Sequence, residues 1–178
     1  DPTSTRQIVL NTSSDILSEK DVRIALQHAT NKQNISDGIF YGLEKPADTL
    51  FAKTIPYCNI DLEPYAYDLE LAGQILDDAG WKMGSGNVRG KDGKQLNIDL
   101  LYNSDSVTEK SIAEYLQSEY QTIGVSLNIH GEEEQSYRDN MKAGNFDMVF
   151  NICWGMPYDP QSSLAAMRAP VYGDYAAQ

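Results

Sequence analysis

The sequence predicts an α/β fold, a largely parallel or mixed sheet flanked by helices. Residues 96–100 and 125–129 alternate apolar and polar side chains, as half-buried strands do. Between the expected strands, apolar residues recur at the three- and four-residue spacing of a buried helix face. Strands that alternate with helices of about ten to fifteen residues are typical of α/β folds with parallel neighbours. A chain of 178 residues can bury the core of one such domain.

The first half of the chain is expected to form one strand and three helices. Ser18 is the expected N-cap of the first helix, and Asp68 that of the third. Gly42 and Gly80 are expected to end helices, because glycine adopts the left-handed backbone of a helix C-terminus at little cost. The predicted elements are a strand over residues 8–11, helices over 22–29, 35–41 and 71–79, and a proline-bearing loop over 44–64.

The second half of the chain is expected to form alternating strands and helices after a glycine-rich hairpin or loop. Ser106 and Glu109 have the spacing of a capping box, in which two side chains satisfy backbone N–H groups at a helix start. Gly144 is expected to end a later helix. The predicted elements are a loop over residues 82–94, strands over 96–100, 125–129 and 147–154, and helices around 112–120, 137–141 and 162–167.

Composition and charge exclude several classes of partner. The formal charge of −12 argues against nucleic acid and anionic membranes, which need clustered lysine and arginine. No apolar run approaches the roughly 20 residues of a membrane helix, and no signal peptide is visible. Neither end of the sequence carries a recognisable start or stop signal, so the chain is expected to be processed or to be part of a longer polypeptide. Cys58 and Cys153 permit one disulfide without requiring it.

Motifs for catalysis or metal binding are missing from the sequence. The glutamate run at residues 132–134 is the one acid–base candidate, and a hydrolase using it is the alternative from another class. Adjacent helical side chains diverge by about a hundred degrees, and carboxylates at a helix start suit the helix dipole, which favours a structural role. His28 and His130 have no third ligand at metal-site spacing. No nucleophile or phosphate-binding motif appears.

The most informative segment follows the last predicted strand. Trp154 and Tyr158 leave this strand together, joined through Gly155 and the stiffening Pro157. Ligands of α/β sheets usually bind beyond the carboxyl ends of strands, which is where this segment lies. Core packing is the commoner role for such an aromatic pair. A stiffened loop favours exposure and contact with a ligand.

Several ordered motifs make the chain resemble family 5 extracellular solute-binding proteins, the receptors of dipeptide, oligopeptide and nickel ABC importers. The resemblance runs from about Val22 to Arg168. The motifs that carry it are Val22-Arg-Ile-Ala-Leu-Gln-His-Ala-Thr-Asn-Lys32, Tyr67-Asp-Leu-Glu-Leu-Ala-Gly-Gln-Ile-Leu-Asp-Asp-Ala-Gly-Trp81, Asp92-Gly-Lys-Gln-Leu96 and Gly144-Asn-Phe-Asp147. The family fold has two lobes that close on the ligand, and its chains are some three times longer. The resemblance therefore implies that residues 1–178 form one ligand-binding lobe of a longer receptor.

Further motifs resemble the nickel-binding branch of this family. They are Ala47-Asp-Thr-Leu-Phe-Ala52, Ile55-Pro-Tyr-Cys-Asn59, Gly131-Glu-Glu-Glu134 and Trp154-Gly-Met-Pro-Tyr-Asp-Pro160. Peptide receptors of the family carry an aspartate shortly after the tryptophan, where it pairs with the peptide ammonium group. Pro157 stands at that position here and cannot form such a pair. A dipeptide, oligopeptide or other small-solute receptor of the same family is the alternative.

The resemblance implies a function in transport and no catalysis. The expected ligand is a Ni(II) chelate of a small organic molecule, in a cavity lined by Trp154 and Tyr158. No permanently bound cofactor is expected. Tyr172 stands where a nickel receptor can place a metal-binding histidine, and a neutral phenol is a poor nickel ligand. The implied receptor is a bacterial, extracytoplasmic monomer, periplasmic or a cell-surface lipoprotein, which delivers its ligand to a membrane ABC permease.

Overall fold

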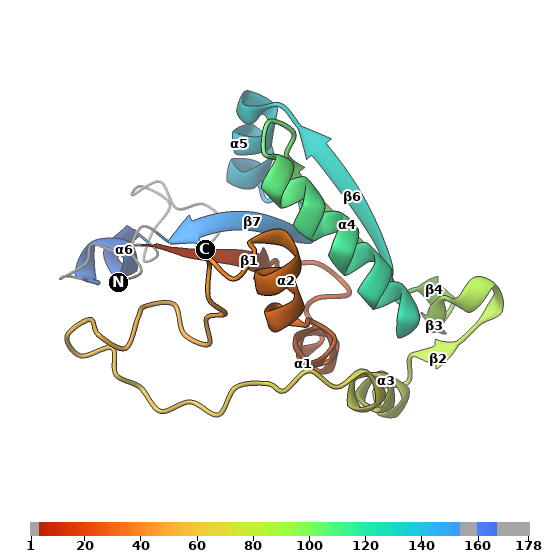
Figure 1. Ribbon diagram of the computed structural model, residues 1–178. Helices are drawn as coiled ribbons and strands as arrows, with labels where there is room; N and C mark the ends of the chain where they lie inside the picture. The colour runs from red at the N-terminus through yellow and green to blue at the C-terminus, as the bar shows by residue number, and fades with distance from the viewer. Residues whose placement is uncertain (1–3, 154–159, 167–178) are drawn as a thin grey trace.

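The computed structural model describes residues 4–153 and 160–166, which form an α/β domain with a four-stranded and a three-stranded sheet (Figure 1). The elements are β1 (Thr5–Leu10), α1 (Lys20–His28), α2 (Lys32–Ile39), α3 (Leu69–Asp78), β2 (Lys82–Met83), the 3₁₀ turn η1 (Ser85–Asn87), β3 (Arg89–Lys91), β4 (Lys94–Gln95), β5 (Asn97–Asn103), α4 (Val107–Thr122), β6 (Ser126–Glu132), α5 (Glu134–Ala143), β7 (Met148–Cys153) and α6 (Gln161–Ala166). None of the helices in the described ranges is long and apolar enough to cross a membrane.

The main sheet is mixed, with strand order β1-β7-β5-β6. β5 runs parallel to both of its neighbours, and Leu100 of β5 lies opposite Met148 of β7 and Ile129 of β6. β1 is antiparallel to β7, with Arg6 opposite Ile152. The fold class predicted from the sequence is confirmed, and the antiparallel strand at the edge makes the sheet mixed.

Alternate residues of the central strands serve two different cores. Ile98 and Leu100 of β5 are fully buried in the larger core, together with side chains from α1, α3 and α4. Leu101 points to the other face, where it packs with Tyr137 of α5 and Val149 of β7. The sheet is therefore covered by several helices on one face and by α5 on the other. β6 alternates apolar and polar residues because only the face that it turns toward the larger core is deeply buried.

Helix ends follow the predicted signals with two exceptions. Asp68 caps α3 by accepting a hydrogen bond from the N–H of Leu71, as predicted. The prediction that Ser18 caps α1 is wrong: Glu19 is the N-cap, and the Ser18 hydroxyl donates to the Asp15 carbonyl instead. The helix predicted over residues 35–41 begins earlier, at Lys32, because the Asn31 side chain accepts from the N–H of Asn34.

The segment predicted as a glycine-rich hairpin or loop forms the small antiparallel sheet β2-β3-β4, so the hairpin alternative is confirmed. Buried Arg89 of β3 holds this sheet against the main domain. Its guanidinium donates to the Ile123 and Trp81 carbonyls and pairs with Asp77 at 2.8 Å. A buried arginine is stable when its N–H groups find acceptors, as Nε and Nη1 of Arg89 do. The small sheet is therefore a fixed part of the fold.

Candidate functional site

The residues predicted to contact the ligand fall at the edge of what the structure describes. Trp154, Tyr158 and Tyr172, together with Pro157, lie outside the described residues. The structure describes the strand that leads into this segment, β7, which ends at Cys153, and the helix that follows the aromatic pair, α6. The ligand contacts of the three aromatic residues therefore stay predictions.

The topology of the main sheet defines the edge at which a ligand is expected to bind. α4 connects β5 to β6 across one face of the sheet, and α5 connects β6 to β7 across the other. The chain therefore leaves the neighbouring strands β5 and β6 toward opposite faces of the sheet. Ligands of open α/β sheets bind at such a switch point, outside the carboxyl ends of the strands. β7, the strand that precedes the predicted aromatic loop, runs parallel to β5, so its carboxyl end lies at the same edge of the sheet.

Asn103, the last residue of β5, organises the polar contacts at this edge of the sheet. Its main-chain N–H donates to Glu109 at 2.9 Å, and its side-chain amide donates to Glu134. These two glutamates lie near the first turns of α4 and α5, so both helices begin at this edge of the sheet. Helix N-termini stabilise carboxylates through their partial positive charge. Asn103 thus ties the end of β5 to the starts of both covering helices.

The capping box predicted at the start of α4 is only half formed. Ser106 accepts a hydrogen bond from the N–H of Glu109 at 3.2 Å, as predicted. The Glu109 carboxylate reaches the N–H of Asn103, three residues before the cap, in place of the N–H of Ser106. Burial raises the pKa of Glu109, while the Asn103 hydrogen bond and the charge of Arg6 oppose the rise. This carboxylate therefore stabilises the turn after β5.

Arg6 supplies positive charge at the same end of the sheet. It lies on β1 opposite Ile152, just before the aromatic loop begins. Its guanidinium is 3.6 Å from Glu44 and stacks over the Phe40 ring at 5.7 Å. The Nε of Arg6 is buried and has no hydrogen-bond partner among the described residues. A buried donor left this way is uncommon, and it places hydrogen-bonding capacity beside the start of the loop.

The glutamate run has a structural role in the described fold. The three residues are split between elements: Glu132 ends β6, Glu133 is the N-cap of α5, and Glu134 is the first residue of that helix. The prediction that all three belong to a helix start is therefore wrong for Glu132. Its carboxylate accepts from the side chains of Ser136 and Asn140. Glu134 is bound by Asn103 and Arg138, so these carboxylates are occupied in holding α5 on the sheet.

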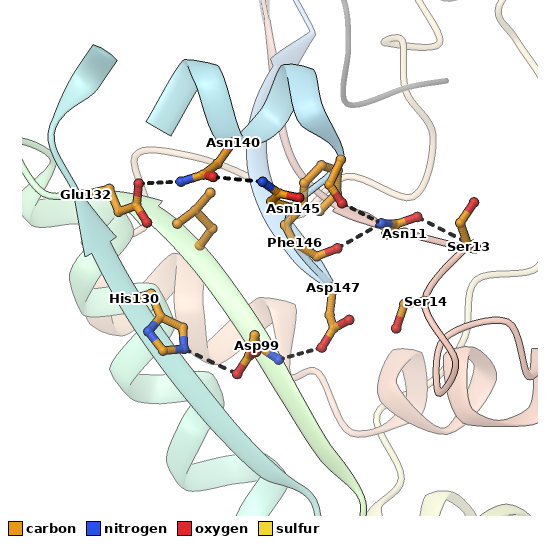
Figure 2. A pocket seen from close by; sticks show the side chains of 12 residues that line it. Asn11, Ser13, Ser14, Asp99, His130, Glu132, Asn140, Asn145, Phe146 and Asp147 are labelled. Carbon is orange, nitrogen blue, oxygen red and sulfur yellow. Dashed lines mark hydrogen bonds and ion pairs between the residues drawn. The ribbon is translucent and has the colours of Figure 1, made fainter. Parts of the chain in front are cut away.

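A polar hollow of about 490 Å³ opens on the α5 face of the sheet (Figure 2). Within it, the His130 ring lies 3.2 Å from Asp99, whose main-chain N–H donates to Asp147 at 2.9 Å. Sequence reasoning missed this hollow, although the exposed polar positions of β5 and β6 were its signal. Among the described residues, no group of three or more histidine, cysteine, aspartate or glutamate side chains could hold a metal ion. His28, the other histidine, contacts the Ala66 carbonyl at 2.7 Å.

Comparisons with known proteins cover almost the entire chain. The model of bacterial extracellular solute-binding proteins, family 5 middle, matches residues 1–174. The nickel-binding periplasmic protein of Escherichia coli is 39% identical over 178 residues, which is 99% of this chain and 34% of that protein. The oligopeptide-binding protein AppA of Bacillus subtilis is 28% identical over 77% of this chain and 26% of its own length.

A solved structure agrees with these sequence matches. NikA from Brucella suis, in complex with Fe(III)-EDTA, is 42% identical with a TM-score of 0.91, covering 100% of this chain and 36% of that chain. The chain thus spans about a third of the length of the relatives it matches. The family model, the relatives and the solved structure agree with the motifs and with the mixed α/β sheet. The chain belongs to family 5 of the bacterial extracellular solute-binding proteins.

Proposed function

We propose that this chain is one ligand-binding lobe, residues 1–178, of a bacterial receptor that captures nickel as a small organic chelate. One observation carries the proposal: 39% identity to the Escherichia coli nickel-binding periplasmic protein across 99% of the chain. The receptor is extracytoplasmic, periplasmic or a cell-surface lipoprotein, and acts as a monomer. It closes two lobes on the chelate and delivers it to a membrane ABC permease, without catalysis and without a permanently bound cofactor.

The proposed ligand contacts come from the loop after β7 and from the chain beyond α6. Trp154 stacks on the chelator, and the Tyr158 hydroxyl donates a hydrogen bond to it. Stacking suits a flat, conjugated or carboxylated chelator held at the switch point of the sheet. Tyr172 lines the same cavity as a neutral side chain, and metal coordination is left to the chelator. Arg6 lies opposite Ile152 near the end of β7, and Asn103 ends the parallel neighbour β5.

A dipeptide or oligopeptide receptor is the second candidate, supported by the oligopeptide-binding relatives. Their identities of 27% and 28% are lower than that of the nickel-binding protein. Pro157 also disfavours this candidate, because it cannot pair with a peptide ammonium group. The chemistry of the loop thus favours a ligand without a free α-ammonium group at that position.

Calorimetry on the complete receptor polypeptide separates these two candidates. We expect heat of binding from nickel mixed with histidine and none from di- to pentapeptides. The Trp154→Ala variant should bind the nickel chelate at least about 1 kcal/mol more weakly, the scale of one aromatic stacking contact. Trp154→Phe is the matched control, because it keeps a ring in place and should retain most of the affinity.

Two outcomes would overturn the proposal. Peptide binding without any heat from nickel and histidine would assign the chain to a peptide receptor. Equal affinity of wild type and Trp154→Ala would remove this tryptophan from the ligand cavity. A fold-preserving readout, such as the urea unfolding midpoint, distinguishes lost binding from a misfolded variant.

A further inference from the structure

A long segment without helix or strand joins α2 to α3 and exposes large apolar side chains. Figure 1 shows it as an extended arc that swings away from the helices before it returns to α3. Loops of this length without secondary structure are uncommon in compact domains and are usually functional. We name its exposed apolar residues the apolar strip: Tyr41 (85% exposed), Leu43 (87%), Tyr57 (101%), Ile60 (51%), Leu62 (56%) and Tyr65 (49%).

The segment is anchored to the domain at its start. The Ser36 hydroxyl of α2 donates to the Glu44 carbonyl, and the Lys32 ammonium donates to the Ala47 carbonyl at 3.1 Å. Lys32 also pairs with Asp48 at 3.2 Å. These contacts fix the beginning of the segment against α2.

The segment is anchored again at its end and has a small core of its own. His28 of α1 contacts the Ala66 carbonyl, and the Tyr67 hydroxyl donates to Glu119 of α4 at 2.6 Å. Between the anchors, buried Phe51, Ile55 and Cys58 pack together. The apolar strip therefore lies on a segment that is fixed at both ends and has a small core of its own.

Two residues of the apolar strip hold a backbone conformation that non-glycine residues rarely adopt. Tyr41 has φ +54° and Tyr57 has φ +67°. Left-handed backbone at a bulky residue costs free energy and persists where the surroundings impose it, often at functional surfaces. In both cases the aromatic ring that results is exposed to solvent. This combination of strain and exposed apolar surface is unfavourable in water and favourable once a partner covers the ring.

The apolar strip begins at the end of the molecule that carries the candidate site. Glu44, next to Leu43, pairs with Arg6 at 3.6 Å, and Arg6 lies opposite Ile152 near the carboxyl end of β7. In Figure 1 the far turn of the segment lies at the same end as α6. A body that closes over the carboxyl end of β7 therefore approaches the apolar strip as well.

We propose that the apolar strip is the surface on which the rest of the receptor polypeptide packs. The inference rests on the proposed function, because it takes the chain as one lobe of a receptor about three times as long. The part of the receptor outside this chain is large enough to cover the strip, because this chain spans only 34% and 36% of the length of two relatives. The partner surface is apolar and offers hydrogen-bond acceptors to the tyrosine hydroxyls.

Hydrogen exchange and limited proteolysis of the complete receptor test this surface. Residues 55–65 should exchange slowly and resist cleavage in the monomeric receptor, without any added permease. Leu43→Ser/Leu62→Ser should raise exchange and cleavage of this segment at least tenfold. Met83→Ser is the matched control, because Met83 is 51% exposed on the small sheet and should leave the segment protected.

Each other outcome overturns the inference. Exchange at the rate of an unstructured peptide in the wild-type receptor would show that nothing covers the apolar strip. Protection that depends on protein concentration would assign the strip to a second copy, and protection that needs the permease would assign it to that partner. Nickel-chelate binding is measured separately: a protected strip in a receptor that binds no nickel would refute the proposed function alone.

Discussion

Glu109 is a buried carboxylate whose ionisation opposes folding. Burial raises its pKa above the ordinary value of 4.5, despite the hydrogen bond from Asn103. A carboxyl whose pKa is raised by folding stabilises the fold below its unfolded pKa, and this contribution is lost as the pH rises through the folded pKa. Ionised Glu109 therefore lowers the free energy of unfolding at neutral pH relative to a neutral side chain of the same shape.

The Glu109→Gln variant tests this effect, because the amide oxygen can still accept from Asn103 and carries no charge. We expect its free energy of unfolding to rise relative to wild type between pH 4 and pH 7, by about 1.4 kcal/mol for each tenfold change in proton affinity. Urea unfolding at the two pH values measures the difference. Glu114→Gln removes an exposed charge from the same helix and is the control. A Glu109→Gln difference that is flat with pH would contradict the prediction.

At the scale of elements, the start of α3 depends on one side-chain cap. Asp68 accepts from the N–H of Leu71 at 2.9 Å, and its own N–H donates to the His28 carbonyl. Asp68→Ala leaves the Leu71 N–H without its acceptor, so the free energy of unfolding should fall by about 1 kcal/mol. Asp68→Asn keeps an acceptor oxygen and should lose only part of this. Urea unfolding midpoints compare the variants, and equal midpoints for Ala and Asn would show that the cap contributes nothing.

Helices and central strands were predictable because their signals are local. Asp68 and Gly144 mark helix ends through backbone chemistry that needs no tertiary context. Ser18 is not the cap because α1 begins at Lys20, which makes Glu19 the N-cap, and the Ser18 hydroxyl donates back to the Asp15 carbonyl in the preceding turn. A hairpin was one alternative predicted for the small sheet. Its attachment to the domain was missed, because Arg89 makes it through carbonyls of Trp81 and Ile123, contacts that no local pattern reveals.

The position of the candidate site was predicted from the sequence, and its ligand contacts stay predictions. The end of the last strand marked this position, and the sheet has its switch point at the same edge, between β5 and β6. Asn103 and Arg6 were missed because their roles depend on register: Asn103 reaches Glu134 across two elements, and Arg6 comes from a strand far away in the sequence. Spacing along the chain carries no trace of such contacts.

At the scale of the whole molecule, the proposed function makes this chain one wall of the ligand cavity. Its charge is −12, and the cations near the carboxyl end of β7 include Arg6, which already pairs with Glu44. An anionic chelator held by Trp154 and Tyr158 alone would lack opposing charge and a surface to exclude water. Both would come from the remainder of the longer polypeptide, through the closure that the proposed function requires.

We therefore expect the 178-residue chain alone to bind the nickel chelate at least a hundredfold more weakly than the complete receptor. A factor of one hundred corresponds to about 2.7 kcal/mol, a modest share of what a second wall contributes. Calorimetry with nickel and histidine measures both affinities, and circular dichroism confirms that the short chain is folded. Equal affinities would show that one lobe suffices for capture, which would contradict both the closure mechanism and the assignment of half the cavity to the missing chain.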